Sequence, residues 1–110
     1  MRSSAFDVRT ATDGSMVVRP HGTVGADRAV ELQQMLVHTL RKVRPLRLIL
    51  DLGDVFELDP INVGTLAAAC ELGDDQQVVV FLDNSPAHLA TQLTAAGVPH
   101  QRLRRVAGHG

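Results

Sequence analysis

Apolar and polar positions alternate in the first twenty residues of the chain and then change to helical spacing. Residues 5–11 and 15–20 alternate in the way expected of strands with one solvated face. Asp13-Gly14 lies between them and predicts a tight hairpin turn. Pro20 should end the second strand, and the two glycines of residues 22–25 predict a loop.

The middle of the chain predicts a helix followed by a buried strand. Asp27 is a candidate cap for a helix that runs to about Lys42, with cations at its end. Its apolar stripe consists of Ala29, Leu32, Leu36 and Leu40. Residues 46–52 are almost continuously apolar, which is typical of a central parallel strand covered on both faces.

The remaining elements follow in short succession. In chain order they are a loop (53–58), a helix (60–72), a turn (73–76), a strand (77–82), a third helix opened by a Ser85 cap and Pro86, and an edge strand (100–106). The third helix should bury Leu89, Leu93 and Ala96 and end at Gly97. The order β-β-α-β-α-β-α-(β) predicts an α/β fold, a mixed central sheet with helices packed against it.

Size and charge narrow the class of protein. The chain has 110 residues, so we expect one domain over 1–110 with a core of about 5–106. A net charge of −1 argues against a nucleic-acid partner. No apolar run is long enough to span a membrane, and Cys70 is a lone cysteine that reads as a buried hydrophobe. We therefore expect a cytoplasmic protein that is not inserted in a membrane.

The most informative local signal is the start of the helix at residue 60. Asp59 can accept hydrogen bonds from the first free amides, and Pro60 has no amide to leave unsatisfied. A helix N-terminus beside the end of a buried strand favours anions and partner contacts. The residues just inside this helix, Ile61 to Val63, are therefore candidates for function, and none of them carries a hydroxyl group.

Catalytic and metal-binding patterns are weak. Asp51, Asp54 and Asp59 cluster around one loop and could hold Mg²⁺, although each also has a structural role as a strand end, a turn or a cap. The five histidines form no metal-ligand pair, and His21 and His88, on a loop and a helix start, are most simply surface residues. We expect no cofactor, no metal site and no enzymatic activity.

Three segments together resemble one protein family. They are Asp51-Leu52-Gly53-Asp54-Val55-Phe56-Glu57-Leu58-Asp59; Gly22-Thr23-Val24 followed by Ala29 and Leu32; and Ser85-Pro86 followed by Leu89, Leu93 and Gly97-Val98. In order and spacing they resemble STAS domains, the sulfate-transporter and anti-sigma-factor-antagonist family. The resemblance spans about residues 6–105 and implies a small mixed sheet with helices packed against it.

The resemblance implies an anti-sigma factor antagonist, a non-catalytic domain that binds an anti-sigma factor of the serine-kinase type. The implied partner-binding residues are Asp54, Phe56, Glu57, Asp59, Pro60, Ile61, Asn62 and Thr65. In such proteins the kinase phosphorylates the second serine of an Asp-Ser-Ser-Gly motif, which breaks the complex. Here Pro60 and Ile61 stand where the serines belong and Asn62 replaces the glycine, so the phospho-acceptor position is degenerate.

Other interpretations stay open at this point. Thr65 lies one turn beyond Ile61 and is a conceivable displaced phosphorylation site. Some lone STAS proteins are accessory subunits of membrane transporters of the lipid-transport ATPase type, so a transporter ATPase subunit is a second candidate partner. A nucleotide-binding protein or small enzyme that uses the aspartate cluster is a third, and a homodimer is also compatible with the sequence.

Overall fold

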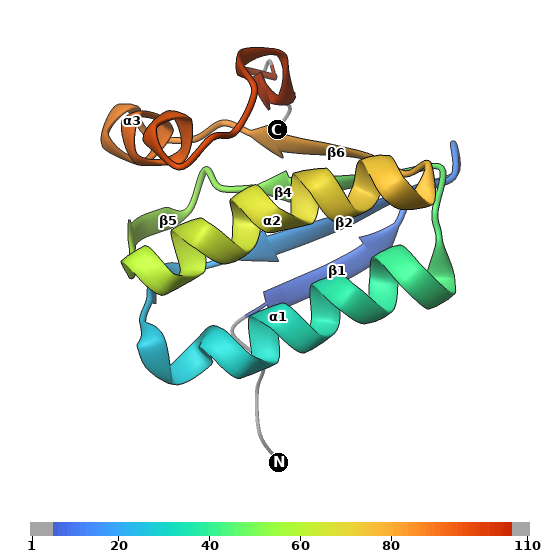
Figure 1. Cartoon of the computed structure of the whole chain (residues 1–110), viewed down its shortest axis with the longest axis horizontal. Coiled ribbons are helices and arrows are strands. Elements are labelled where there is room, and N and C mark those ends of the chain that lie inside the picture. The colour runs from blue at the N-terminus through green and yellow to red at the C-terminus, as the bar shows by residue number, and fades with distance from the viewer. Residues whose placement is uncertain (1–5, 107–110) are drawn as a thin grey trace.

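The computed structural model describes residues 6–106 and contains a five-stranded mixed sheet (Figure 1). Its strands, in spatial order, are β1 (Phe6–Thr10), β2 (Ser15–Pro20), β4 (Arg47–Asp51), β6 (Val79–Asp83) and β7 (Leu103–Arg104). β1 pairs with β2 in antiparallel fashion, and every other neighbouring pair is parallel. The predicted hairpin and the central parallel strand are confirmed; residue 5, predicted to begin the first strand, lies outside the described residues.

Three α-helices accompany this sheet: α1 (Ala29–His38), α2 (Pro60–Gln76) and α3 (Ala87–Ala95). Figure 1 shows α1 and α2 side by side across one face, both beginning at the end of the molecule where β4 and β6 finish. The core between sheet and helices is aliphatic and includes Val18, Leu32, Leu36, Leu40, Leu48, Leu50, Leu66, Val80 and Leu82. The predicted α/β class is confirmed.

The two predicted loops at 22–25 and 53–58 are partly wrong, because they pair with each other. β3 (Gly22–Val24) and β5 (Val55–Leu58) form a separate parallel ladder. The amide of Gly22 donates to the carbonyl of Asp54 at 2.8 Å, and the register shifts after it. Each strand is too short to show a period in its own sequence, so its hydrogen-bonding partner is visible only in the folded chain.

The first two helices begin or end differently from the prediction. Asp27 does not cap α1 with its side chain; it lies inside a 3₁₀ turn, η1 (Ala26–Arg28), that precedes the helix. After α1 a wider turn, η2 (Thr39–Val43), continues the helical path. α2 extends through the predicted turn because Gly73 is a packing glycine: a Cβ there would lie 2.5 Å from the carbonyl oxygen of Val78.

The third helix keeps its predicted position but not its predicted cap or stripe. The residue before it is Pro86, and no side chain caps it; the hydroxyl of Ser85 is buried without a hydrogen-bond partner. Ala96 is exposed, and Val98 takes the buried place beyond the turn at Gly97. The predicted edge strand at 100–106 is a 3₁₀ turn, η3 (His100–Arg102), followed by only two residues of β7.

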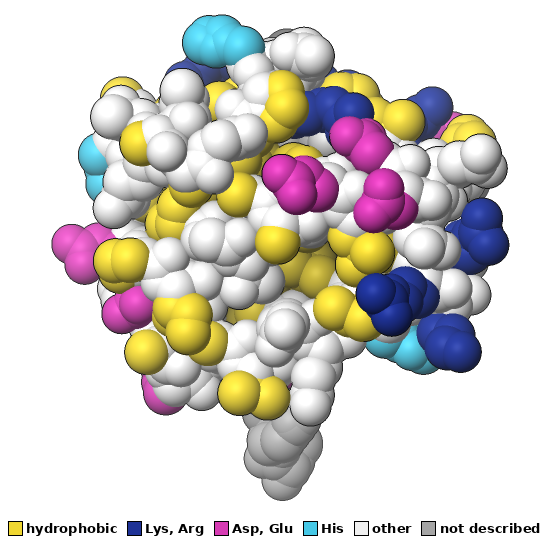
Figure 2. Space-filling model, viewed as in Figure 1, with side chains coloured by type: hydrophobic (Ala, Val, Ile, Leu, Met, Phe, Trp, Pro, Cys, Tyr) yellow, Lys and Arg dark blue, Asp and Glu magenta, His cyan; other side chains and the backbone are white. Residues whose placement is uncertain are grey.

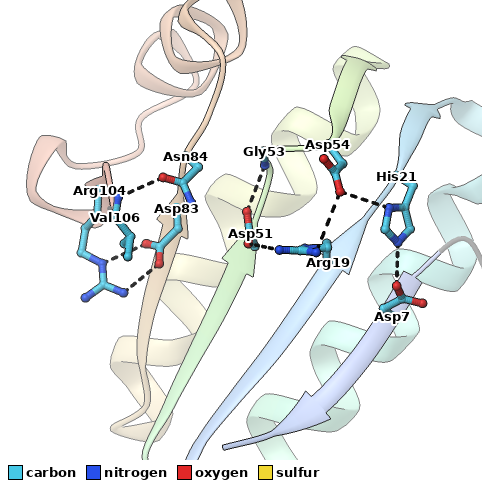
Figure 3. A network of polar contacts seen from close by, with 10 residues as sticks. All are labelled: Asp7, Arg19, His21, Asp51, Gly53, Asp54, Asp83, Asn84, Arg104 and Val106. Atoms are coloured by element: carbon cyan, nitrogen blue, oxygen red, sulfur yellow. Dashed lines mark hydrogen bonds and ion pairs between the residues drawn. The ribbon is translucent and has the colours of Figure 1, made fainter. Parts of the chain in front are cut away.

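The face of the sheet away from α1 and α2 carries a layer of paired charges (Figure 3). Arg19 contacts Asp51 at 3.2 Å, and Arg104 makes two 2.9 Å hydrogen bonds to the carboxylate of Asp83. The Arg104 guanidinium also lies 3.8 Å from the centre of the Phe81 ring. The Arg104 guanidinium therefore both pairs with Asp83 and covers the half-buried Phe81 ring.

Candidate partner-binding surface

The start of α2 has the local geometry that the sequence predicts. Asp59 is the N-cap residue in an extended conformation, and its carboxylate accepts the amide of Ile61 at 3.0 Å. Pro60 occupies the first helical turn. Ile61 itself is 55% exposed at this helix start. An isoleucine so exposed contributes little to the core.

β5 places a second large apolar side chain beside this helix start. Phe56 is 70% exposed, and Glu57 next to it is also exposed, whereas Val55 and Leu58 at the strand ends are buried. His88 at the start of α3 holds the strand by a 2.7 Å hydrogen bond to the Phe56 carbonyl oxygen. The exposed Phe56 side chain thus stands on a backbone that α3 holds in place through His88.

Asn62 does not lie on this exposed surface, contrary to the prediction. It is fully buried, and its side-chain amide donates to the carbonyl oxygens of Val24 and Gly25, at 2.9 Å each. The Asn62 oxygen Oδ1 has no hydrogen-bond partner. The residue therefore fixes the segment after β3 to the start of α2, and any effect on a partner is indirect. The sequence carries no signal for this role, because the two carbonyls come from a distant segment.

Thr65 lies one turn beyond Ile61 and is half-buried. Its hydroxyl donates to the Ile61 carbonyl oxygen at 3.0 Å, a common back-bond within helices. A kinase would have to draw this hydroxyl away from the backbone before it could accept a phosphoryl group.

The three aspartates of the predicted cluster are held by protein groups, and Arg19 lies between two of them, 3.2 Å from Asp51 and 4.0 Å from Asp54 (Figure 3). Asp51 accepts from Arg19 and from the amide of Gly53, Asp54 lies 3.6 Å from His21, and Asp59 caps α2. Within residues 6–106 no three acidic, histidine or cysteine side chains are arranged to hold a metal ion. The arrangement gives the magnesium alternative no support.

The histidines are more engaged than the prediction of plain surface residues implies. His21 lies between two carboxylates, 2.7 Å from Asp7 and 3.6 Å from Asp54, and so connects β1 to the loop before β5. His88 holds the backbone of Phe56. Their positions next to polar turns gave no hint of these contacts, since each partner is more than ten residues away in the sequence.

Cys70 is buried, as predicted. Burial raises the pKa of its thiol to about 11, so the thiolate that would act as a nucleophile is scarce at neutral pH.

Except for the half-buried cap residue Asp59, the predicted residues from β5 and the first turn of α2 are exposed, with Asn62 as a buried support. We call Asp54, Phe56, Glu57, Asp59, Pro60 and Ile61 the β5–α2 surface. Beside it is a hollow of about 340 Å³, lined by Thr23, Gly25, Glu57, Leu58, Asp59, Pro60, His88 and Gln92. No helix within residues 6–106 is long and apolar enough to cross a membrane.

Comparisons with known proteins agree with the fold. The family model of the STAS domain matches residues 7–102. Bacillus SpoIIAA in its phosphorylated form superposes with a TM-score of 0.79 at 13% identity, covering 94% of this chain and 92% of that chain. A putative anti-sigma factor antagonist from Thermotoga maritima gives 0.78 at 14% identity, covering 93% and 86%. A search of curated proteins found no match.

A third similar structure has a different context. A sulfate transporter family protein from Wolinella succinogenes superposes with a TM-score of 0.67 at 16% identity, covering 87% of this chain and 80% of that chain. At these identities the three structures establish the shared fold.

Proposed function

Because the chain belongs to the STAS domain family, we propose that it is a regulatory domain that binds an anti-sigma factor of the serine-kinase type through the β5–α2 surface. The observation that supports this proposal is the exposure of Phe56 and Ile61, at 70% and 55%, on either side of a capped helix start. Burial of either side chain in a complex would contribute about 1.5–3 kcal/mol. Asp54, Glu57 and Asp59 provide the polar rim that surrounds such anchors in protein interfaces.

The same surface lacks the usual phospho-switch. Phosphorylation works by adding about two negative charges inside an interface, and it requires a hydroxyl. Pro60 and Ile61 provide none at the two positions that match the family serines. We therefore propose that an anti-sigma kinase binds this chain without phosphorylating it there, and that partner abundance sets the level of the complex.

Binding can be measured by calorimetry with purified anti-sigma kinases encoded in the same genome. We expect Phe56→Ala and Ile61→Asp each to weaken the complex at least tenfold, with an unchanged circular dichroism spectrum. The matched control is Leu46→Ala, because Leu46 is similarly exposed, at 62%, outside the β5–α2 surface and immediately before β4. Binding that resists both surface substitutions contradicts the proposed surface, and no binding by any such kinase contradicts the proposed partner.

The switch is tested separately by mass spectrometry after incubation with the kinase and ATP. We expect the mass of the natural chain and of Ile61→Ser to stay unchanged, because Pro60 and Asn62 also depart from the recognised motif. The triple variant Pro60→Ser, Ile61→Ser, Asn62→Gly should come closer to an acceptor, provided that it folds. One added phosphate on Thr65 of the natural chain would show that the switch has moved instead of disappearing.

The likeness to a sulfate transporter family protein supports a second candidate. In that case the β5–α2 surface binds a cytosolic ATPase subunit of a transporter. The same variants distinguish the two candidates. The transporter is favoured if a purified ATPase subunit binds the natural chain, binds Phe56→Ala more weakly, and anti-sigma kinases do not bind.

A further inference from the structure

An apolar groove runs between α1 and α2 on the outer side of the helix layer. It encloses about 320 Å³ and is lined by Gln33, Leu36, Val37, Leu40, Ile61, Gly64, Thr65, Ala68, Ala69 and Leu72. Figure 2 shows hydrophobic side chains in the furrow between the two helices. From Ile61 to Leu72 the groove follows α2 for about 16 Å, three helical turns.

The groove is kept open by small side chains on α2. Gly64 is exposed, and a Cβ built on it would meet no atom within 4 Å. Glycine lowers helix propensity relative to alanine, and here no contact within residues 6–106 requires it. Ala68, one turn further on, is likewise exposed and small.

The two helices that form the groove carry opposite charges at the same end. Arg41 and Lys42 are exposed where α1 passes into η2, and Glu71 and Asp75 are exposed near the end of α2. Figure 2 shows the acidic side chains on one side of the apolar furrow and the basic ones on the other. Within the part of the chain that the structure describes, no ion pair joins the two groups across the groove.

This arrangement is self-complementary under one symmetry operation. A twofold axis that lies along the groove turns one copy face to face with another, exchanges α1 and α2, and keeps the direction of both helices. The basic end of α1 then faces the acidic end of α2 of the second copy, twice. A twofold axis perpendicular to the groove would instead place the two charged groups at opposite ends.

We propose that the α1–α2 groove is a homodimer interface in which α1 of one copy packs over α2 of the other. The apolar furrow around Gly64 supplies the contact surface, and Arg41 and Lys42 pair with Glu71 and Asp75 of the second copy. This inference goes beyond the proposed function and does not depend on it. It uses a different surface, although Ile61 belongs to both.

Two charge-reversed variants test the pairing by analytical ultracentrifugation up to millimolar concentration. One is Arg41→Glu with Lys42→Glu, and the other is Glu71→Lys with Asp75→Lys. Each variant alone brings like charges together across the interface, so we expect self-association at least tenfold weaker than that of the natural chain. An equimolar mixture restores both pairings, so we expect a heterodimer of natural affinity. Arg9→Glu, an exposed charge reversal on β1, is the control and should dimerise normally.

Filling the groove provides a second measurement. Gly64→Leu should weaken self-association at least tenfold with the fold intact, because the added side chain meets open space within one chain. Gly64→Ala adds only one methyl group and should retain the dimer. A natural chain that stays monomeric at millimolar concentration overturns the proposal. The same holds if the groove binds a helix of another protein while the chain stays monomeric. Failure of the mixed variants to associate overturns the pairing.

Discussion

Polar and apolar groups have opposite roles on the β5–α2 surface and on the far face of the sheet, which is the face away from α1 and α2. On the far face, Arg104 and Arg19 pair with carboxylates of neighbouring strands, so the layer completes the fold. On the β5–α2 surface, Phe56 and Ile61 remain exposed on a backbone that is held by caps and by Asn62. The difference separates groups that stabilise this chain from groups available to another molecule. Substitutions in the two regions should accordingly affect different measurements.

The largest effect is expected beneath the β5–α2 surface, at Asn62. Asn62→Asp replaces the donor to two carbonyl oxygens with a buried carboxylate, which should lower the free energy of unfolding by about 3 kcal/mol or more. Chemical denaturation measures this change. Asn84→Asp is the matched control, because Asn84 uses its side-chain oxygen to accept the Val106 amide. A small loss at Asn62 would show that its hydrogen bonds to Val24 and Gly25 do not hold the start of α2 in place.

The next effect is expected on the far face. Arg104→Ala leaves the buried carboxylate of Asp83 without its guanidinium and uncovers the Phe81 ring, which should cost about 2 kcal/mol of unfolding free energy. Partner affinity should not change. The control is Arg9→Ala at an exposed arginine, for which we expect the unfolding free energy to change by less than about 0.5 kcal/mol. Lost partner binding with Arg104→Ala in a folded chain would contradict the division between the regions.

These contrasts also explain how far the sequence could predict the molecule. The Asp59–Pro60 start of α2 was predictable because a cap and a first-turn proline are local signals. The hairpin and the central strand followed from alternation and a continuous apolar run. The pairing of β3 with β5 could not be predicted, because each strand is short and its partner is about thirty residues away.

The misjudged residues share the same cause. Gly73 resembled a helix stop, but its lack of a Cβ allows the backbone of Val78 to approach. Asn62 resembled a surface residue at a helix start, but its partners belong to another segment. Ser85 had the composition of a cap, yet the turn before α3 points its hydroxyl into the protein. Local chemistry predicts where elements begin, whereas contacts between distant segments decide what the side chains do.

A smaller effect on stability is expected for the exposed anchor itself. Phe56→Ser should change the unfolding free energy by less than about 0.5 kcal/mol, because the residue is 70% exposed in the folded chain. The same variant should lose partner affinity, which is the reverse of the expectation for Arg104→Ala. Denaturation and calorimetry on these two variants form a direct test. A destabilised Phe56→Ser would mean that the side chain belongs to the fold and not to an interface.

The smallest effect is a pH dependence from another charge pair, Asp13 and Arg47, at the turn of the β1–β2 hairpin. The backbone amide and the hydroxyl of Ser15 lower the pKa of the Asp13 carboxyl below its usual 3.8, with a further contribution from Arg47. A lowered pKa in the folded chain means that the carboxylate stabilises the fold fully above its unfolded pKa, and that this contribution is lost as pH falls through the lowered value. Asp13→Asn should therefore be slightly less stable than the natural chain above about pH 5, and the gap should close as pH falls below about 4. Thermal melts of both chains across this range measure the gap. If the stability difference between the two chains grew toward acidic pH, the sign would be opposite to the prediction. Asp13 would then not be a charge that stabilises the fold.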